Sequence, residues 1–233
     1  MLIIGHRGVA GHYPENTAAS IQAAIDLDLT WVEVDVQPCK DGHLVVCHDH
    51  TVDRCSDGTG RVDTLTLSAL KRLNFAARYE GQVTPQTLLT LEELLTLIKP
   101  SDIKLNIEVK VDTHDAQSVC ALLASALNAT SIPLERIILS SFSHDVMREL
   151  AKQIPQCRRA LLTERLKRKD WRLLKEVEAT GCNIGATWAT KSTVSKLQDA
   201  GYEVWCYTIN NPKRLKHLSQ LDGIFSDYPE RFL

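Results

Sequence analysis

The stretch Trp31-Val32-Glu33-Val34-Asp35-Val36 alternates apolar and acidic side chains. Successive side chains of a β-strand point to opposite faces, so this pattern places three valines on one face and two acids on the other. A second stretch, Lys104-Leu105-Asn106-Ile107-Glu108-Val109-Lys110, repeats the arrangement. We therefore expect two strands whose apolar residues pack against helices and whose acids share the opposite face.

Similar short apolar runs recur along nearly the whole chain and alternate with helical patterns. Beside the two stretches above, they lie at residues 2–5, 136–140, 158–163, 183–188, 203–207 and 223–226. Helix start signals stand between them, among them Pro14-Glu15-Asn16-Thr17 and the capping box Thr90-Leu91-Glu92-Glu93. Eight strand and helix units in 233 residues predict an α/β fold, a (β/α)8 TIM barrel. An open doubly wound sheet is disfavoured because no GxGxxG motif follows the first strand.

One region interrupts the alternation. Lys40-Asp41-Gly42 is a hairpin turn signal that leads into an extra strand at residues 43–48. A polar, turn-rich segment follows it and holds one helix-like run, at residues 68–77. We interpret residues 49–89 as a small insertion after the second strand, within a single domain of residues 1–233.

Composition and charge exclude several classes of protein. The 27 Lys and Arg against 29 Asp and Glu give a formal net charge of −2, so nothing electrostatic points to nucleic acid. Seven cysteines form no CxxC pair, so neither a disulfide framework nor a zinc site is expected. Without a signal-like start or a run of about 18 apolar residues, we expect a cytoplasmic protein with no stable membrane insertion.

The acids Glu33, Asp35 and Glu108 need partners or a cation, because a buried unpaired carboxylate is costly. Three oxygen donors without a cysteine suit a hard divalent ion, Mg²⁺ or Ca²⁺, better than Zn²⁺. The alternative is a salt-bridged barrel interior with Lys110 as the counter-ion. The pattern by itself leaves both interpretations open.

Two histidines stand at strand ends, His6 after the first strand and His48 after the extra strand. Histidine titrates near neutrality, so the pair can provide one general acid and one general base. Arg7 and Lys110 supply positive charge for an anionic substrate. Spacing alone does not exclude three other histidines from either role: His12, His43 and His50.

In order and spacing these motifs resemble those of the glycerophosphodiester phosphodiesterases, and the resemblance spans essentially the whole chain. The early motifs are His6-Arg7-Gly8, Pro14-Glu15-Asn16-Thr17, Glu33-Val34-Asp35, Lys40-Asp41-Gly42 and His48-Asp49. The later ones are Asn106-Ile107-Glu108-Val109-Lys110, Ser141-Phe142 and residues 204–210 and 222–229. Leu89, where the family usually has proline, and Ser143-His144 depart from the family pattern, but neither is a proposed catalytic position.

The resemblance implies a TIM barrel that hydrolyses glycerophosphodiesters to glycerol 3-phosphate and an alcohol. It implies one divalent cation, Mg²⁺ or Ca²⁺, with Mn²⁺ also compatible. By position it places the catalytic histidines at His6 and His48, the metal ligands at Glu33, Asp35 and Glu108, and the substrate-binding residues at Arg7, Lys110 and Trp205. The implied partner is a small glycerophosphodiester, and a homodimer is left open.

Three other functions are weighed against this one. A lipid phosphodiesterase that acts on acyl chains favours exposed apolar loops, whereas residues 49–89 are polar. A non-catalytic barrel would be expected to lack one of the two histidines or one of the three acids, and this chain has all five of these residues. An amidohydrolase has His-x-His on its first strand, where this chain has His6-Arg7-Gly8. Which histidine is the base, and whether water or a glycerol hydroxyl attacks, the sequence does not decide.

Overall fold

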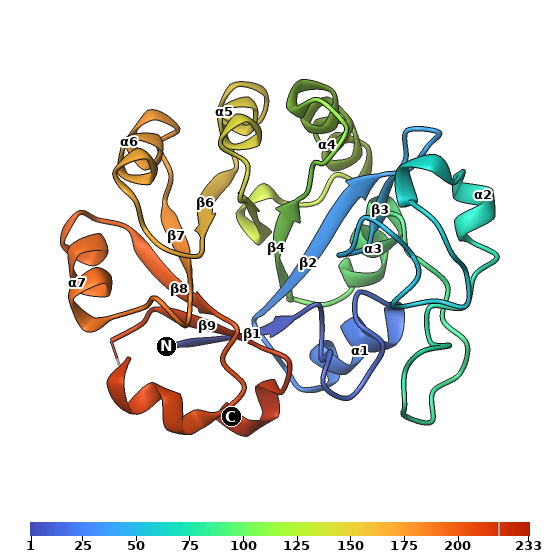
Figure 1. Ribbon diagram of the computed structural model, residues 1–233, viewed down its shortest axis with the longest axis horizontal. Coiled ribbons are helices and arrows are strands. Elements are labelled where there is room, and N and C mark those ends of the chain that lie inside the picture. Colours follow the sequence, from blue (N-terminus) through green and yellow to red (C-terminus); the bar gives the residue numbers. More distant parts are fainter. Residues whose placement is uncertain (219) are drawn as a thin grey trace.

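The computed structural model describes residues 1–218 and 220–233, and within them eight parallel strands close into a barrel (Figure 1). The first and second barrel strands pair with each other, and the last barrel strand pairs back with the first. This arrangement confirms the predicted (β/α)8 barrel. The strands are β1 (Leu2–His6), β2 (Trp31–Pro38), β4 (Lys104–Val109), β5 (Ile137–Ser141), β6 (Arg158–Thr163), β7 (Gly181–Gly185), β8 (Glu203–Tyr207) and β9 (Gly223–Ser226).

The helices lie around the outside of the barrel (Figure 1). Side chains at their starts accept backbone N–H groups, as Thr17 and Thr90 do, and the capping box predicted at Thr90 is present. A 3₁₀ helix, η3 (Pro212–His217), stands between β8 and β9 in place of an α-helix. The outer α-helices are α1 (Ala18–Asp26), α3 (Leu91–Ile98), α4 (Ala116–Thr130), α5 (His144–Gln153), α6 (Arg168–Glu176) and α7 (Lys191–Asp199). Two short 3₁₀ helices also occur, η2 (Leu134–Arg136) before β5 and η4 (Pro229–Phe232) after β9.

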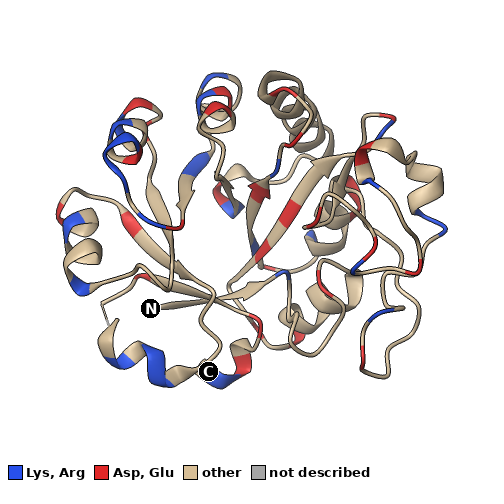
Figure 2. Ribbon diagram, in the orientation of Figure 1, with Lys and Arg blue, Asp and Glu red and all other residues tan. Residues whose placement is uncertain are grey.

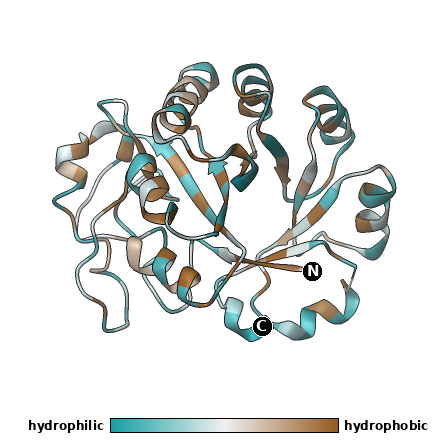
Figure 3. Cartoon of the chain, turned by 180° about the vertical axis from the view of Figure 1, so that it is seen from behind, coloured by the Kyte–Doolittle hydropathy of each residue, from teal (hydrophilic) through white to brown (hydrophobic). Residues whose placement is uncertain are grey.

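The alternation along β2 and β4 works as expected. Val32, Val34, Ile107 and Val109 are buried in the core between strands and helices, which leaves the acids on the inner face. Figure 3 shows apolar and polar bands along the strands and helices. One predicted strand has different bounds in the structure. The strand predicted at 183–188 ends at Gly185, because a turn forms there and Trp188 N donates to Gly185 O at 3.0 Å.

The barrel interior is filled near the starts of the strands by an apolar set that we call the lower layer. Trp205 lies at its centre, and its ring is 5.3 Å from that of Trp31 and 5.7 Å from that of Phe225. These edge-to-face contacts pack the barrel as a solid core. The lower layer consists of Ile4, Trp31, Ile138, Ala160, Trp205 and Phe225.

The chain between β2 and α3 departs from the barrel pattern. β3 (Leu44–Val46) pairs antiparallel with β2 after a turn in which Gly42 adopts a φ of +83°. Residues 49–89 pack around a small apolar cluster that includes Val52, Leu70 and Phe75. They hold η1 (Val62–Thr64) and α2 (Leu67–Leu70), so the helix predicted at 68–77 is shorter than expected and turns follow it.

Two further observations concern the whole described chain. All seven of its cysteines are free thiols, as expected. Every helix in residues 1–218 and 220–233 is too short or too polar to cross a bilayer.

Candidate active site

Three carboxylates meet inside the barrel toward the carboxyl ends of β2 and β4. Asp35 and Glu108 are register partners on these strands, and Glu33 lies two residues before Asp35 on the same face. One oxygen from each of the three lies within 4.8 Å of the others, and Glu33 and Asp35 are buried. The backbone register of two neighbouring strands thus assembles the cluster that the sequence predicted. Figure 2 shows the acidic positions on both strands.

Asp35 is the best-paired member of the cluster. Lys110 Nζ lies 3.3 Å from its Oδ1, Arg7 Nε lies 3.3 Å from its Oδ2, and Asn16 Nδ2 donates to Oδ2 at 2.9 Å. Burial by itself would raise the pKa of Asp35, but the charges of Lys110 and Arg7 lower it to about 2. This carboxylate is therefore ionised at neutral pH.

Glu33 and Glu108 are less well compensated. Glu33 Oε2 accepts the backbone N–H of Arg7 at 3.0 Å, whereas its buried Oε1 has no hydrogen-bond partner. Glu108 accepts from Lys110 Nζ at 2.9 Å. Burial first, and then the charge of Asp35, raises the pKa of both glutamates. An orphaned carboxylate oxygen among oxygen donors fits a hard divalent cation, and a purely salt-bridged interior leaves that oxygen unexplained.

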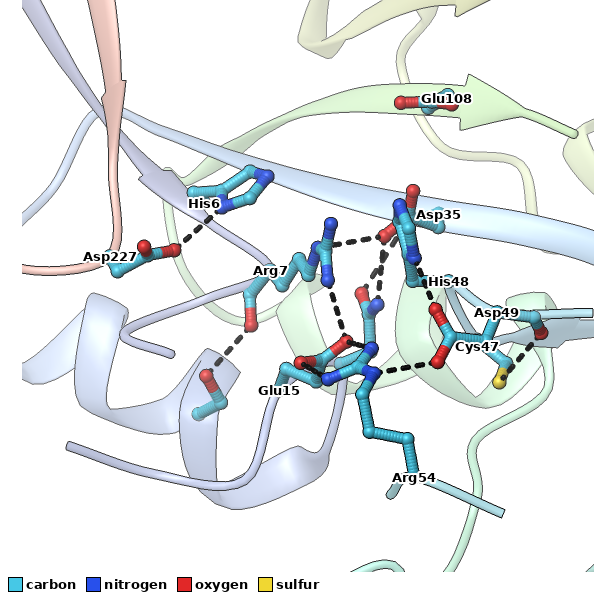
Figure 4. Close-up of polar contacts among 12 residues, drawn as sticks. His6, Arg7, Glu15, Asp35, Cys47, His48, Asp49, Arg54, Glu108 and Asp227 are labelled. Carbon is cyan, nitrogen blue, oxygen red and sulfur yellow. Dashed lines mark hydrogen bonds and ion pairs between the residues drawn. The ribbon is translucent and has the colours of Figure 1, made fainter. Parts of the chain in front are cut away.

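His6 enters the same cavity from the end of β1 (Figure 4). Its Nδ1 donates to Asp227 Oδ1 at 2.6 Å, and its Nε2 lies 3.8 Å from Glu33 Oε2. Asp227 is held in turn by Asn210, whose Nδ2 donates to Oδ2 at 2.6 Å. A carboxylate on Nδ1 fixes the ring and its tautomer, so Nε2 is the nitrogen presented to the acids.

The turn after β1 lets neighbouring residues reach one site. Arg7 has a φ of 54° and Gly8 a φ of 89°, so the chain leaves extended geometry directly after His6. A side chain at Gly8 would collide with Ser20 on α1. The turn aims the Arg7 side chain at Asp35 while the His6 ring faces Glu33.

His48 follows β3, and it lies on the side of Arg7 that is opposite His6 (Figure 4). Its Nδ1 donates to Asp49 Oδ1 at 2.7 Å, so it too is oriented by a carboxylate. Burial and the nearby charges of Arg7 and Lys110 lower the pKa of His48. Of the three alternative histidines, His12 pairs with Glu230 and His43 is exposed. His50 donates to Gln37 Oε1 at 3.0 Å and lines a neighbouring pocket with Glu108 and Lys110.

The cavity above the lower layer has aromatic walls. The structure does not bring Trp205 to it, since that ring is buried in the lower layer with 2% of its surface exposed. Tyr207, two residues further along β8, lines the cavity instead, together with Phe142 after β5. The full lining is His6, Glu33, Asn106, Glu108, Phe142, Leu162, Tyr207 and Phe225.

Several residues that complete the site have no role in the sequence-based predictions. Asp49 and Asp227 stand in the quoted motifs, but their pairing with histidines is not visible there, because Asp227 lies 221 positions from His6. Tyr207 shares the alternation of Trp205 on β8, so the same pattern allows either residue. Asp227 directly follows β9, so a polar residue after a strand end is the signal that could have found it.

Comparisons with known proteins agree with this geometry. The family model described as "Glycerophosphoryl diester phosphodiesterase family" matches residues 6–231. The chain is 31% identical to a glycerophosphodiester phosphodiesterase of Caldanaerobacter subterraneus subsp. tengcongensis, covering 100% of this chain and 96% of that protein. It is 32% identical to one from Bacillus altitudinis, covering 98% and 95%. An Oleispira antarctica phosphodiesterase, solved with the product sn-glycerol-3-phosphate, superposes with a TM-score of 0.90 at 28% identity, covering 99% and 94%.

Proposed function

The chain belongs to the glycerophosphoryl diester phosphodiesterase family, and from this premise we propose that it hydrolyses glycerophosphodiesters to glycerol 3-phosphate and an alcohol. One observation supports the proposal most. Two histidines, each oriented by a carboxylate on Nδ1, approach one three-carboxylate cluster that also holds an arginine and a lysine. General acid–base chemistry on an anionic ester needs this combination.

The phosphate group is assigned to Arg7 and Lys110. With all three carboxylates ionised, the cluster would exceed the two cationic side chains by one negative charge and would repel a phosphodiester. A divalent cation held by Glu33, Asp35 and Glu108 would reverse that balance and neutralise charge on the phosphate oxygens. Mg²⁺ or Ca²⁺ suits these oxygen donors, and Mn²⁺ is also compatible.

Proton transfer is assigned to the two histidines. One takes the proton of the attacking oxygen, and the other gives a proton to the departing oxygen. Both rings donate through Nδ1 to an aspartate, which leaves Nε2 of each as the reacting atom. The attacking oxygen belongs to water or to a glycerol hydroxyl that first forms a cyclic phosphate, and either uses the same two groups.

The glycerol moiety is assigned to the aromatic wall of the cavity. Tyr207 and Phe142 lie 5.8 Å apart with their rings nearly perpendicular, and both line the space next to Glu33 and Glu108. Apolar ring faces suit the carbon chain of glycerol, and the phosphate would then face Arg7 and Lys110. We assign this contact to Tyr207 in place of Trp205.

The test is release of glycerol 3-phosphate from glycerophosphocholine and glycerophosphoethanolamine, measured with a coupled glycerol-3-phosphate dehydrogenase. We expect turnover with Mg²⁺, Ca²⁺ or Mn²⁺, its loss in excess EDTA, and its return when the ion is restored. No release with any of the three ions would contradict the proposed function. Full activity in EDTA after dialysis would contradict the metal assignment alone.

A further inference from the structure

Arg54 lies in the 49–89 segment and makes an unusual set of contacts for a side chain that is half exposed (Figure 4). Its Nε donates to Asp49 Oδ2 at 2.6 Å. Its Nη1 and Nη2 donate to the two oxygens of Glu15 at 2.7 and 2.8 Å. One guanidinium thus joins two carboxylates that come from different parts of the chain.

Each of these carboxylates also holds a residue of the proposed active site. The second oxygen of Asp49 accepts from Nδ1 of His48 at 2.7 Å. Glu15 Oε1 accepts from Nη1 of Arg7 at 2.7 Å. Arg54 is therefore linked to His48 through the carboxylate of Asp49, and to the proposed phosphate-binding Arg7 through the carboxylate of Glu15.

Ordinary exposed ion pairs contribute little, because water and salt screen them. Three charge-assisted hydrogen bonds from one guanidinium group contribute more than such pairs, because the planar group fixes the direction of both carboxylates. Burial would raise the pKa of Asp49, but hydrogen bonds from Arg54 and His48 lower it to about 2. The hydrogen bond of Arg54 likewise helps to lower the pKa of Glu15 against the effect of burial.

We propose that Arg54 is a positioning residue that orients His48 through Asp49 and Arg7 through Glu15. The inference rests on the proposed function. It assigns the 49–89 segment a part in the reaction, because this segment supplies the group that fixes one histidine and one arginine at once. His6 receives its orientation from Asp227 at the end of β9 and does not depend on this contact.

The same segment offers a matched control. Arg61 is also partly exposed and also bridges two carboxylates, with Nη2 2.6 Å from Asp63 Oδ2 and 2.7 Å from Asp112 Oδ2. The other side-chain donor to Asp63 in the described residues is Thr113, which has no role in the proposed chemistry. Arg61→Ala therefore removes a similar bridge without touching a group that orients the active site.

The experiment measures kcat and KM for glycerophosphocholine in the full chain with Mg²⁺. We expect Arg54→Ala to lower kcat roughly 10- to 100-fold, as small displacements of a catalytic group do, and to raise KM as well. Asp49→Asn should reproduce the kcat effect and Glu15→Gln the KM effect. Arg54→Lys should recover part of the loss, because lysine keeps the charge but lacks the fork. Arg61→Ala should stay within about twofold of the wild type in both constants.

A double-mutant comparison separates positioning from a general effect on folding. In a His48→Ala background, Arg54→Ala should change kcat little further while it still raises KM. If Arg54→Ala does not fold, Arg54→Gln takes its place with the same expectations. A kcat within twofold of the wild type for the folded variant, or an equal loss of kcat in the His48→Ala background, would overturn the inference. An inactive wild-type chain would overturn the proposed function instead.

Discussion

The lower layer and the acid cluster above it lie on the same inner face of the same barrel, yet their chemistry is opposite. Trp31 opens β2 in the lower layer, and Glu33 and Asp35 follow it on that face. Below, aromatic and aliphatic side chains exclude water. Above, three carboxylates, Arg7 and Lys110 lie among polar partners. The inward-facing residues at the start of β2 thus stabilise the fold, whereas those further along the strand belong to the proposed active site.

This division has an energetic basis. Burying a large apolar side chain stabilises the fold by about 1.5–3 kcal/mol, whereas burying charged groups costs free energy unless they are well paired. The acid cluster, with its orphaned Glu33 oxygen, is maintained by the rest of the fold. Substitutions in the two regions should therefore separate: the cluster should affect activity and the lower layer should affect unfolding.

The largest effect on turnover is expected at the two histidines. His6→Ala and His48→Ala should each lower kcat by about 10²- to 10⁴-fold, because each removes a proton-transfer group. The double variant should lose far less than the product of the two losses, since both groups act on one reaction. Steady-state kinetics measures this, and thermal unfolding should change little. Near-normal turnover in either single variant would reassign its role, with His50 the first replacement to examine.

The next effect concerns the acids. Glu108→Gln removes a charge and keeps the shape, so we expect weaker metal binding with little change in fold. The loss in affinity should exceed the roughly 10- to 100-fold that outer-shell changes cause. Titration of turnover with Mg²⁺ measures the shift. An unchanged midpoint would remove Glu108 from the ligand set and favour the salt-bridged interpretation with Lys110.

A smaller effect on turnover but a large one on stability is expected in the lower layer. Trp205→Ala should lower the free energy of unfolding by about 3–5 kcal/mol, because it leaves a cavity in a packed interior. KM should stay within about twofold of the wild type, whereas Tyr207→Ala should raise KM with a smaller loss of stability. Urea unfolding and steady-state kinetics on both variants test this. A raised KM in a folded Trp205→Ala protein would return substrate contact to Trp205.

The smallest effect is a pH-dependent gain in stability on metal binding. The raised pKa values of Glu33 and Glu108 contribute stability that is fully present below about pH 4.5 and is lost as pH rises through those values. Asp35, with a pKa lowered to about 2, contributes in the opposite sense, but only below about pH 4. Mg²⁺ replaces the lost protons, so it should raise Tm more at about pH 8 than at about pH 5.

Thermal unfolding with and without Mg²⁺ at both pH values checks this expectation, and 1 kcal/mol corresponds to about 2–4 °C in a chain of this size. Glu108→Gln serves as the control, because it should reduce the difference between the two pH values. Equal Tm increases at both would mean that the ion does not compete with protons at the acid cluster.

Several elements could be predicted closely, and two others could not. β6, β8 and β9 match the sequence prediction, since short β-branched runs bounded by turns are a local signal. β7 ends before its predicted end because the apolar residues after Gly185 form a turn. The helix predicted at 68–77 stops at Leu70, where packing onto Val52 and Phe75 decides the path of the chain.

The sequence by itself determined which residues face inward on β2 and β4, because apolar and polar side chains alternate residue by residue along both strands. Only the tertiary structure decided that His6 meets Asp227, that Arg54 meets Glu15, and that Tyr207 and not Trp205 reaches the cavity. The physical reason is that these contacts depend on barrel closure and on the height of each side chain along the barrel axis. Both follow from the packing of all eight strands together, and no local pattern encodes them.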